Sequence, residues 1–558
     1  MAVSIVMELN PCIMKRTLLT LASILGGLAL SAQTSSPVRI SGREVLWDDF
    51  LTEECSAQKV MHSPWYKAPV VTLDKPWEGD GCGYFNILRD PQTSTWFMYY
   101  TALEMFRPDG SFSPTSDIHA CVMTSSDGIN WTRPELGIVE FDGSGANNII
   151  VGIENMPGLT GVDNFYVMLD TNPSPAVPQR FKAVMRYDSI GPDGTRQRRL
   201  ASLVSDDGLH FQLLGTVTDK GYFDTLNTVM WHEASGRYIC FVRSFHQKDT
   251  FKEYEGKEKD GSLNSFVRDI RVLYSDDFLT WTQPQRLNFD SVRDYPLYTN
   301  GVSVYPYAPQ MLVGFPTRYV EREEWSDNFD RLCGREKRLE RMKYEQRFGL
   351  AVTDCLFMCS RDGRNWHRND EAFLRPGPEY PTNWVYGSCY PCIGMTESPS
   401  EIPGGDNILN MFVYRNHWSG EPTVLERYAM RKDGFVSLHA GVEEAGLLTK
   451  PFVFAGDGMT LNLSTSAAGH VHVTLIREED GLRTRSCEIF GDSTDRPVSF
   501  DRPLSEFAGR SVRMLLELSD ADVYAFEFTM SNPSSLDGHS KAEQVKRCQF
   551  PCIHKLIF

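Results

Sequence analysis

A short turn motif that recurs along the chain constrains its fold more than any other feature. The first copy is Ser125-Ser126-Asp127-Gly128-Ile129-Asn130-Trp131, and later copies are centred on Asp207, Asp277, Asp362 and, in degenerate form, Asp433. Successive aspartates are 70 to 85 residues apart, which is the length of a four-stranded sheet with its loops. Aspartate accepts hydrogen bonds from nearby backbone and glycine adopts positive φ, so each copy predicts a tight turn between the outer two strands of a sheet. Five copies predict five blades of a β-propeller.

Two strand-like runs separated by a short, mostly polar connection precede each predicted turn. They are rich in β-branched and aromatic residues, which favours antiparallel pairing. We expect these runs to form the first two strands of each blade, at 83–88 with 96–101, 164–169 with 181–187, 225–231 with 238–243, 301–305 with 311–318, and 388–394 with 408–415.

Beyond the last turn the pattern changes. Residues 434–532 contain short runs of alternating apolar and polar side chains, which is typical of an antiparallel β-sandwich. The predicted fold class is therefore all-β, with a five-bladed β-propeller over 40–433 followed by a C-terminal β-sandwich over 434–532. Composition changes again at 533–558, which we expect to be a loose tail.

The first 33 residues have the pattern of a secretory signal peptide. Two basic residues precede the apolar run 17–30, and small residues suited to cleavage follow it. Met14 stands directly before this pattern and is an alternative start. The sequence thus predicts a secreted or periplasmic protein, and no later segment is apolar over enough residues to span a membrane.

Charge and cysteine content exclude several classes of function. The formal net charge of -17 argues against binding to nucleic acid or to anionic membranes, which need a basic surface. The 13 cysteines are scattered through strand-like segments, as at Cys121, Cys240, Cys355 and Cys359, and indicate small buried residues rather than a disulfide scaffold. Cys389 and Cys392 have the spacing of a zinc motif but lack a second ligand pair, so we expect no metal and no cofactor. The sequence does not predict the oligomeric state.

Long insertions gather on one predicted face of the propeller. Connections between strands two and three, and between blades, share this face, and they include the insertions 102–118, 187–198, 244–266 and 319–349. Long irregular loops in a compact domain usually carry function. We therefore expect the active site at this opening, the mouth of the propeller.

Residues just before the inner strands converge on the predicted mouth. Three blades supply carboxylates there, namely Glu78, Asp80, Asp163 and Asp224, and the other two supply Tyr298, Asn300, Trp384 and Tyr386. Cleavage of a glycosidic bond needs one carboxylic acid and one carboxylate about 5 to 9.5 Å apart. Strand starts around a propeller axis can provide such a pair.

An arginine stands at the mouth end of the second strand in four blades: Arg186, Arg243, Arg318 and Arg415. Arginine binds carboxylates through two parallel hydrogen bonds, so this set favours an acidic sugar as substrate. The alternative is that the arginines neutralise the carboxylates of the mouth and keep them ionised.

With these motifs the chain resembles the five-bladed propeller glycoside hydrolases of families 32, 43 and 68, and more closely a poorly characterised family-32-like bacterial group. The resemblance covers about 40 to 530 and is carried by the turns, by Trp131-Thr132-Arg133-Pro134-Glu135-Leu136-Gly137 and by Gly314-Phe315-Pro316-Thr317-Arg318-Tyr319. It implies that Asp80 is base or nucleophile, that Asp163 orients and tunes it, and that Asp224 is the acid. Blade one lacks the family-32 Asn-Asp-Pro-Asn-Gly box, and Asp224 stands where these families have glutamate, so Glu78 is a second candidate for the acid.

The sequence thus predicts a secreted glycoside hydrolase that cleaves an oligo- or polysaccharide with paired carboxylates. A propeller that binds carbohydrate without cleaving it is the main alternative. A sialidase-like enzyme is a further one, although sialidases have six blades and a tyrosine–glutamate pair with no evident counterpart here.

Overall fold

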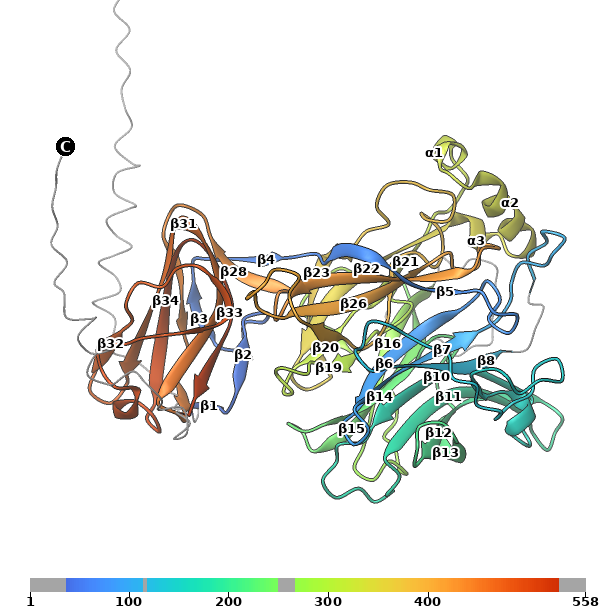
Figure 1. Ribbon diagram of the computed structural model, residues 1–558, viewed down its shortest axis with the longest axis horizontal. Coiled ribbons are helices and arrows are strands. Elements are labelled where there is room, and N and C mark those ends of the chain that lie inside the picture. The colour runs from blue at the N-terminus through green and yellow to red at the C-terminus, as the bar shows by residue number, and fades with distance from the viewer. Residues whose placement is uncertain (1–36, 114–117, 249–265, 531–558) are drawn as a thin grey trace, which may run out of the picture.

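The computed structural model describes residues 37–113, 118–248 and 266–530. The described chain is almost entirely β-structure and forms two domains side by side (Figure 1), a propeller and a smaller β domain. The predicted all-β class and the five blades are confirmed. The predicted signal peptide and the predicted tail both lie outside the described residues.

The first three blades are four-stranded antiparallel sheets in sequence order. Blade one contains β6 (Gly83–Asp90), β7 (Thr95–Ala102), β8 (His119–Ser125) and β9 (Ile149–Val151). Blade two contains β10 (Gly161–Leu169), β11 (Phe181–Ile190), β12 (Arg196–Ser205) and β13 (Gln212–Thr218). Blade three contains β14 (Thr228–His232), β15 (Arg237–Gln247), β16 (Phe266–Ser275) and β17 (Gln285–Arg286).

Blades four and five depart from this simple order. Blade four contains β19 (Ser303–Val304), β20 (Leu312–Gly314), β21 (Thr317–Glu321), β22 (Ala351–Ser360) and β23 (Asn365–Leu374), and β18 (Asn288–Phe289) adds a parallel edge. Blade five contains β24 (Tyr390–Pro391), β25 (Thr396–Ser398), β26 (Ile408–Arg415) and β27 (Thr423–Arg431). Its outer strand is β5 (Trp65–Leu73), which precedes blade one in the chain, so the two ends of the propeller close the ring.

Four of the five repeated motifs are turns of one geometry. In the first, the carboxylate of Asp127 accepts hydrogen bonds from the backbone N–H groups of Ile129 and Asn130, both at 2.8 Å, and Gly128 has a φ of 73°. The copies at Asp207, Asp277 and Asp362 repeat these bonds. Each links the third strand of a blade to the segment that forms its outer edge, as predicted.

The fifth copy is different, and its assignment as an outer-strand turn is wrong. It follows β27 and leads to β28 (Val436–Ala440) of the second domain, because the outer strand of blade five comes from β5 instead. Asp433 is fully buried there and forms an ion pair with Arg43 at 2.6 Å. This copy of the motif is therefore the junction between the two domains.

The second domain begins before the propeller as well as after it. Its eleven strands hydrogen bond as one folded sheet, and four of them precede the propeller: β1 (Val38–Ile40), β2 (Arg43–Val45), β3 (Thr52–Cys55) and β4 (Gln58–Met61). The others are β28, β29 (Ala445–Thr449), β30 (Phe452–Phe454), β31 (Gly458–Arg477), β32 (Arg483–Arg485), β33 (Asp492–Pro497) and β34 (Val512–Thr529). The propeller therefore starts at Trp65 and not at 40, because β1 to β4 find their hydrogen-bond partners in the later strands.

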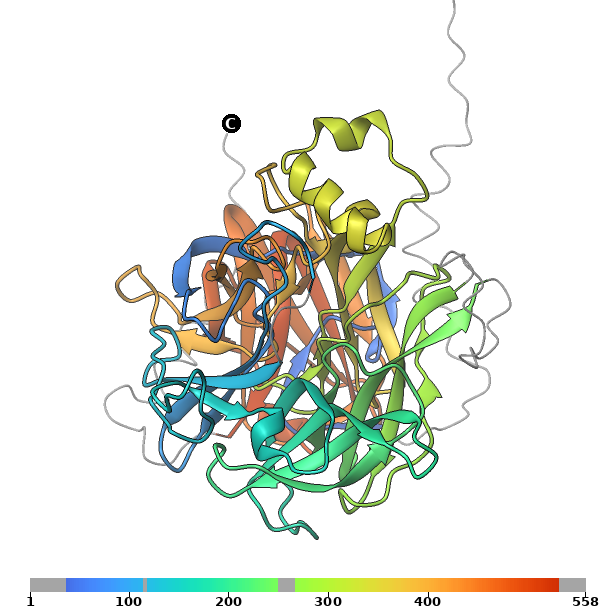
Figure 2. The same ribbon diagram turned by 90° about the vertical axis from the view of Figure 1, so that its right-hand side faces the viewer.

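The predicted mouth face lies away from the second domain. In Figure 2 the ring of blades faces the viewer and the strands of the second domain lie behind it. The insertion of blade four at 319–349, predicted as a long irregular loop, folds into α1 (Asp327–Arg331), α2 (Arg335–Tyr344) and α3 (Arg347–Leu350) on this outer face. Cys121, Cys240, Cys355 and Cys359 are buried and unpaired, as expected, and the described part of the chain forms no disulfide.

Candidate functional site: the mouth of the propeller

Two insertions pack against each other over part of the mouth. Phe112 of blade one contacts Phe348 of α3, with ring centroids 5.8 Å apart, and Trp418 of blade five at 5.9 Å. Met105, Phe106, Phe112 and Phe348 form a small buried cluster of their own. Blades one, four and five are therefore covered at the mouth, and the residues beneath them are withdrawn from solvent.

A cluster of tyrosine hydroxyl groups joins the inner strands beneath the mouth. Tyr298 accepts hydrogen bonds from Tyr386 at 2.9 Å and from Tyr84 at 3.5 Å, and it donates one to the carbonyl oxygen of Asp224 at 3.3 Å. These four residues precede or begin the inner strands of four blades. The predicted convergence of Asp224, Tyr298 and Tyr386 is thus observed, and Tyr84 is an addition to it.

Asp224 is the most accessible of the predicted carboxylates. Its side chain is 45% exposed and forms an ion pair with the buried guanidinium of Arg243. Burial lowers the pKa of Arg243 to about 10, which still leaves it charged at neutral pH. The guanidinium also lies 5.0 Å from the ring centroid of Tyr298. Burial is the largest single effect and disfavours the phenolate of Tyr298. The charge of Arg243, together with the hydrogen bonds from Tyr386 and Tyr84, prevails over it and lowers the pKa of Tyr298.

Asp163 lies on the neighbouring blade in a less polar setting. Its side chain is 13% exposed and accepts a hydrogen bond from Arg186 at 2.6 Å. Burial raises the pKa of Asp163, and the charge of Arg186 offsets this only in part. The side chain of the next residue, Asn164, donates a hydrogen bond to the carbonyl oxygen of Phe223 at 3.2 Å, so the segments carrying Asp163 and Asp224 are adjacent.

Asp80 does not occupy the position predicted for a base or nucleophile. It is buried, and its carboxylate accepts hydrogen bonds from the backbone N–H groups of Met105 at 2.6 Å, Phe106 at 3.2 Å and Gly420 at 2.8 Å. Burial raises its pKa even though these donors oppose the effect. Asp80 thus organises the loops that cover blades one and five, because its oxygens are already satisfied by backbone.

Glu78, the second candidate for the acid, is also engaged within the protein. Its side chain is fully buried and accepts hydrogen bonds from Tyr100 at 2.7 Å and from Arg133 at 2.7 Å. Arg133 belongs to the segment 131–137 that carries part of the family resemblance, and it also binds the carbonyl oxygen of Thr72 in β5. Both residues therefore hold the closure of the propeller together.

The four predicted arginines are each paired with a carboxylate of the protein. Arg186 binds Asp163 and Asp188, Arg243 binds Asp224, Arg318 binds Asp354, and Arg415 binds Glu426. Neutralisation, the alternative interpretation, is thus what the geometry supports for these four side chains. Two of the partners, Asp354 and Glu426, come from third strands, which also run from the mouth.

Three other predicted substrate contacts have structural roles. Asn300 is buried and binds the hydroxyl of Thr228 at 2.9 Å, which joins blades three and four. Tyr386 is buried under Trp418 at a ring distance of 4.8 Å. Trp384 donates a hydrogen bond to the carbonyl oxygen of Gly377 at 2.8 Å and lines a cavity of about 450 Å³ with Arg318 and Pro376.

Several non-glycine residues near the mouth have strained backbone. Positive φ occurs there at Tyr84 (56°), Asn164 (54°), Trp384 (55°), Cys389 (60°) and Trp418 (58°), and elsewhere in the described residues at positions such as Ser94, Phe278 and Asp520. Bulky side chains rarely adopt this conformation, and it persists where packing enforces it.

The residues that sequence reasoning missed lie at the mouth ends of blades three and four. Arg268 begins the third strand of blade three and stacks on Tyr319, with its guanidinium carbon 4.1 Å from the ring centroid. Arg347 of α3 pairs with Glu345 at 2.5 Å and reaches the hydroxyl of Tyr319 at 3.5 Å. Third strands start at the same opening as second strands end, and that rule of the fold could have pointed to Arg268.

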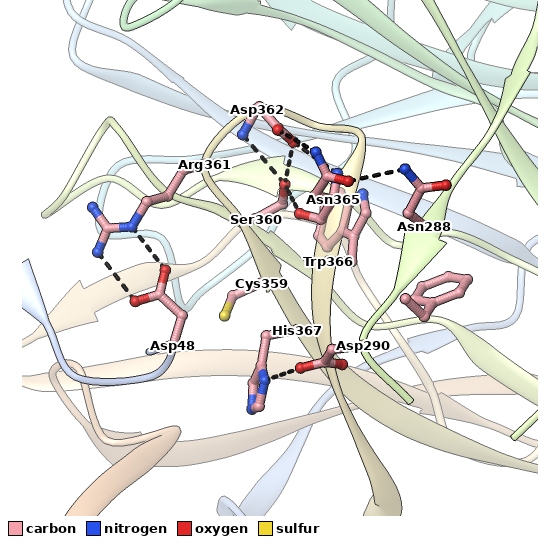
Figure 3. A pocket seen from close by; sticks show the side chains of 11 residues that line it. Asp48, Asn288, Asp290, Cys359, Ser360, Arg361, Asp362, Asn365, Trp366 and His367 are labelled. Carbon is pink, nitrogen blue, oxygen red and sulfur yellow. Dashed lines mark hydrogen bonds and ion pairs between the residues drawn. The ribbon is translucent and has the colours of Figure 1, made fainter. Parts of the chain in front are cut away.

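A separate cavity of about 400 Å³ lies on the opposite face, beside the turn of blade four (Figure 3). Its polar side chains pair with one another: Arg361 with Asp48, His367 with Asp290, and Asp362 with Asn365. Because these groups are satisfied within the protein, we assign the cavity to packing around the turn.

The described residues contain no cluster of three or more His, Cys, Asp or Glu side chains that could hold a metal ion. None of the helices in the same residues is long and apolar enough to cross a membrane.

Fold and site together define a five-bladed β-propeller with two arginine-paired aspartates at its mouth. No protein-family model matches the chain, and no curated protein matches it either. Among solved structures it is similar to a GH32 β-fructofuranosidase from Bombyx mori, with 10% identity and a TM-score of 0.37 over 84% of this chain and 95% of that one. A thermostable family-43 glycoside hydrolase has 12% identity and a TM-score of 0.37 over 66% and 95%.

Another similar structure is an N-acetylgalactosamine deacetylase from F. plautii, solved with blood group B trisaccharide. It has 13% identity and a TM-score of 0.37 over 70% of this chain and 94% of that one. At this level of similarity, the function has to be argued from the residues of the chain itself.

Proposed function

We propose that the chain is a secreted glycoside hydrolase that cleaves a saccharide with the carboxyl groups of Asp163 and Asp224. The observation that carries this proposal is the contrast between the two groups. They lie on adjacent segments, but Asp163 is largely buried with a raised pKa, whereas Asp224 is half exposed beside Arg243. Pairs of carboxyl groups whose surroundings separate their pKa values are typical of acid and base partners.

The roles follow from this contrast. Asp163 retains a proton to higher pH than an ordinary aspartate and can donate it to the leaving oxygen of the sugar. Asp224 forms an ion pair with the adjacent guanidinium of Arg243, and its carboxylate can activate water or attack the sugar. This assignment differs from the one implied by family resemblance, since Asp80 is satisfied by backbone donors.

The substrate is a saccharide, and we propose an acidic one. The four arginines predicted for this purpose are already paired, so the preference must come from other cations at the mouth, of which Arg268 is the strongest candidate. The secretory pattern at 1–33 supports the proposal that the enzyme acts outside the cytoplasm.

The test is release of sugar from a panel of neutral and uronic-acid-containing oligosaccharides. We expect Asp163→Asn and Asp224→Asn each to lower kcat/KM by about 10²- to 10⁴-fold, the usual contribution of one acid or base group. Asp219→Asn is the matched control, because Asp219 is exposed on the segment before Asp224 and its nearest cation, Lys220, is 4.0 Å away. Unchanged turnover in both site variants would disprove the assignment.

A non-catalytic carbohydrate-binding propeller is the second candidate. It is favoured by one observation, that both mouth aspartates are already paired with arginine. It predicts saturable binding of an oligosaccharide with no product over long incubation, and equal affinity in Asp163→Asn. Product release by the wild type would exclude it.

A further inference from the structure

Arg268 is a buried cation that forms no ion pair with the described residues. It is 6% exposed, and its Nε has no hydrogen-bond partner in the same part of the chain. Within 37–113, 118–248 and 266–530, no carboxylate oxygen lies within 4.0 Å of its guanidinium, whereas Arg243 and Arg347 on either side each have one. Burying an unpaired charge is costly, so such a group usually has a ligand.

Aromatic rings hold Arg268 in place without neutralising it. Its guanidinium lies 4.1 Å from the ring centroid of Tyr319, 5.6 Å from that of Phe245 and 5.8 Å from that of Tyr298. Contacts with ring faces stabilise a cation but leave its in-plane N–H groups free to bind an anion. The side chain is therefore fixed in position and still has donors to offer.

Arg268 also lines a cavity of about 330 Å³ between blades three and four. This volume is at the lower end of the range for small-ligand pockets, about 300 to 1,000 Å³, and suits one sugar ring. The wall includes the aromatic rings of Phe289 and Tyr295, which provide apolar surface. The cavity adjoins the mouth, because Tyr319, on which Arg268 stacks, also stacks on Tyr298 at 5.7 Å.

Of the four arginines that line this cavity, Arg268 is the one without an ion pair among the described residues. The others are paired, Arg286 with Asp269 at 3.7 Å, Arg293 with Asp370 at 3.8 Å and Arg368 with Asp370 at 3.0 Å. The two carboxylates that line the cavity are also engaged: Asp269 by Arg271 and His246, and Asp294 by His246. Glu321 interacts with Arg268 electrostatically without an ion pair, and burial raises the pKa of Glu321, which weakens it as a permanent partner.

We propose that this cavity is an anion subsite that binds the carboxylate of a uronic acid, with Arg268 as the residue that selects for the charge. The sugar identity rests on the proposed function, whereas the anion preference rests on Arg268 alone. Arg268 would donate two parallel hydrogen bonds to the carboxylate, and the rings of Phe289 and Tyr295 would contact the sugar.

The experiment is isothermal titration of the full chain with free D-glucuronate, D-glucose, sodium acetate and sodium sulfate at constant ionic strength. Free D-glucuronate has no glycosidic bond, so the outcome does not depend on whether the chain is a hydrolase. We expect saturable binding of D-glucuronate, and affinities for glucose and acetate weaker by about 10-fold or more, since each lacks one half of the ligand.

Three variants locate the binding. Arg268→Met should weaken D-glucuronate binding by about 10- to 100-fold, the range for loss of a charged hydrogen-bonded pair. Arg268→Lys keeps the positive charge but cannot donate two parallel hydrogen bonds, so it should give an intermediate loss of D-glucuronate affinity. If Arg268→Met does not fold, Arg268→Lys serves as the test variant in its place. Arg237→Met is the matched control, because Arg237 is in the same blade, is paired with exposed Asp276 and lies outside the cavity.

Equal binding of glucose and glucuronate, or wild-type affinity in Arg268→Met, would overturn the anion subsite. Sulfate binding as tight as glucuronate, and lost with Arg268, would overturn the uronic acid and identify a free-oxyanion site instead. If the chain hydrolyses no saccharide but still binds glucuronate through Arg268, only the proposed catalytic function is overturned.

Discussion

At the scale of single residues, the state of each carboxyl group at the mouth depends on its nearest partner. Asp80 binds only backbone donors, Asp163 is buried beside one arginine, and Asp224 is exposed beside another. Three aspartates that look equivalent in the sequence thus differ: Asp80 organises loops, whereas Asp163 and Asp224 are the acid and the base of the proposed mechanism. The titration of the proposed acid can be tested directly.

The alkaline limit of activity should respond to Arg186. If Asp163 donates the proton, kcat falls as pH rises through the pKa of Asp163. Arg186 lowers that pKa against the larger effect of burial, so Arg186→Met should raise it and move the alkaline limb upward by about one pH unit or more. The measurement is the pH profile of kcat for both proteins.

The control for this profile is Arg198→Met. Arg198 belongs to the same charge cluster but pairs with Asp188, at 3.4 Å, and not with Asp163. Its profile should match that of the wild type. If the alkaline limb of the kcat profile stays in place or moves to lower pH in Arg186→Met, Asp163 is not the acid.

The extent to which the site could be predicted from the sequence also differs from one residue to the next. Position along the inner strands was enough to bring Asp224, Tyr298 and Tyr386 together, because strand starts around a propeller axis must converge. Burial was not predictable, since the insertions that cover Asp80 are irregular and pack through distant contacts such as Phe112 with Phe348. Ion pairs between strands, such as that of Arg318 with Asp354, depend on the register of the two strands. They could not be predicted either, because register is set by contacts between residues distant in sequence.

At the scale of elements, the repeated turn is a structural motif whose aspartate carboxylate has a low affinity for protons. In blade two the carboxylate of Asp207 accepts hydrogen bonds from the backbone N–H of Leu209 at 2.8 Å and of His210 at 2.9 Å. Burial alone would raise the pKa of Asp207, but these bonds prevail and lower it to about 2. The turn therefore depends on the ionised carboxylate.

Asp207→Ala should lower stability at neutral pH and lose its effect in acid. The folded-state pKa is below the ordinary 3.8, so the stabilisation is complete above pH 4 and is lost as pH falls towards 2. Because the side chain is half exposed, we expect about 1 kcal/mol, or roughly 2 °C in the unfolding temperature. Calorimetry from pH 7 to pH 3 measures the difference from wild type.

Asp206→Ala is the control, since it removes the same charge one residue away from the turn bonds. It should leave the unfolding temperature within about 1 °C of wild type at every pH. A difference for Asp207→Ala that persists unchanged at pH 3 would show that the turn does not need the ionised carboxylate.

The repeats made the elements predictable because each turn is encoded locally, by a side chain and a glycine within a few residues of each other. The closure of the ring was not predictable from the repeats, because β5 pairs with β27, which is about 350 residues away in the sequence. The same holds for β1 to β4, whose partners lie beyond the propeller.

At the scale of the whole molecule, the two domains are joined by a buried polar junction. The guanidinium of Arg43 in β2 binds Asp433 at 2.6 Å, Asp495 at 2.7 Å and the carbonyl oxygen of Thr494 at 2.7 Å. Asp433 in turn accepts hydrogen bonds from Tyr305 of the propeller and Asn462 of the second domain, both at 2.8 Å. One carboxylate thus connects a blade, the first strands of the chain and the C-terminal domain.

Breaking this junction should loosen the docking of the domains. Arg43→Met leaves the carboxylate of Asp433 buried without its cation, which typically costs about 3 to 5 kcal/mol. We expect a lower unfolding temperature and separate calorimetric transitions for the two domains, with no change in Arg39→Met, whose side chain is exposed on the adjacent strand.

Adding Asp433→Asn to Arg43→Met removes the unpaired buried charge and should restore part of the lost stability. Additive losses in the double variant would mean that the pair is not coupled, and the domains would then be held together by their apolar contacts alone.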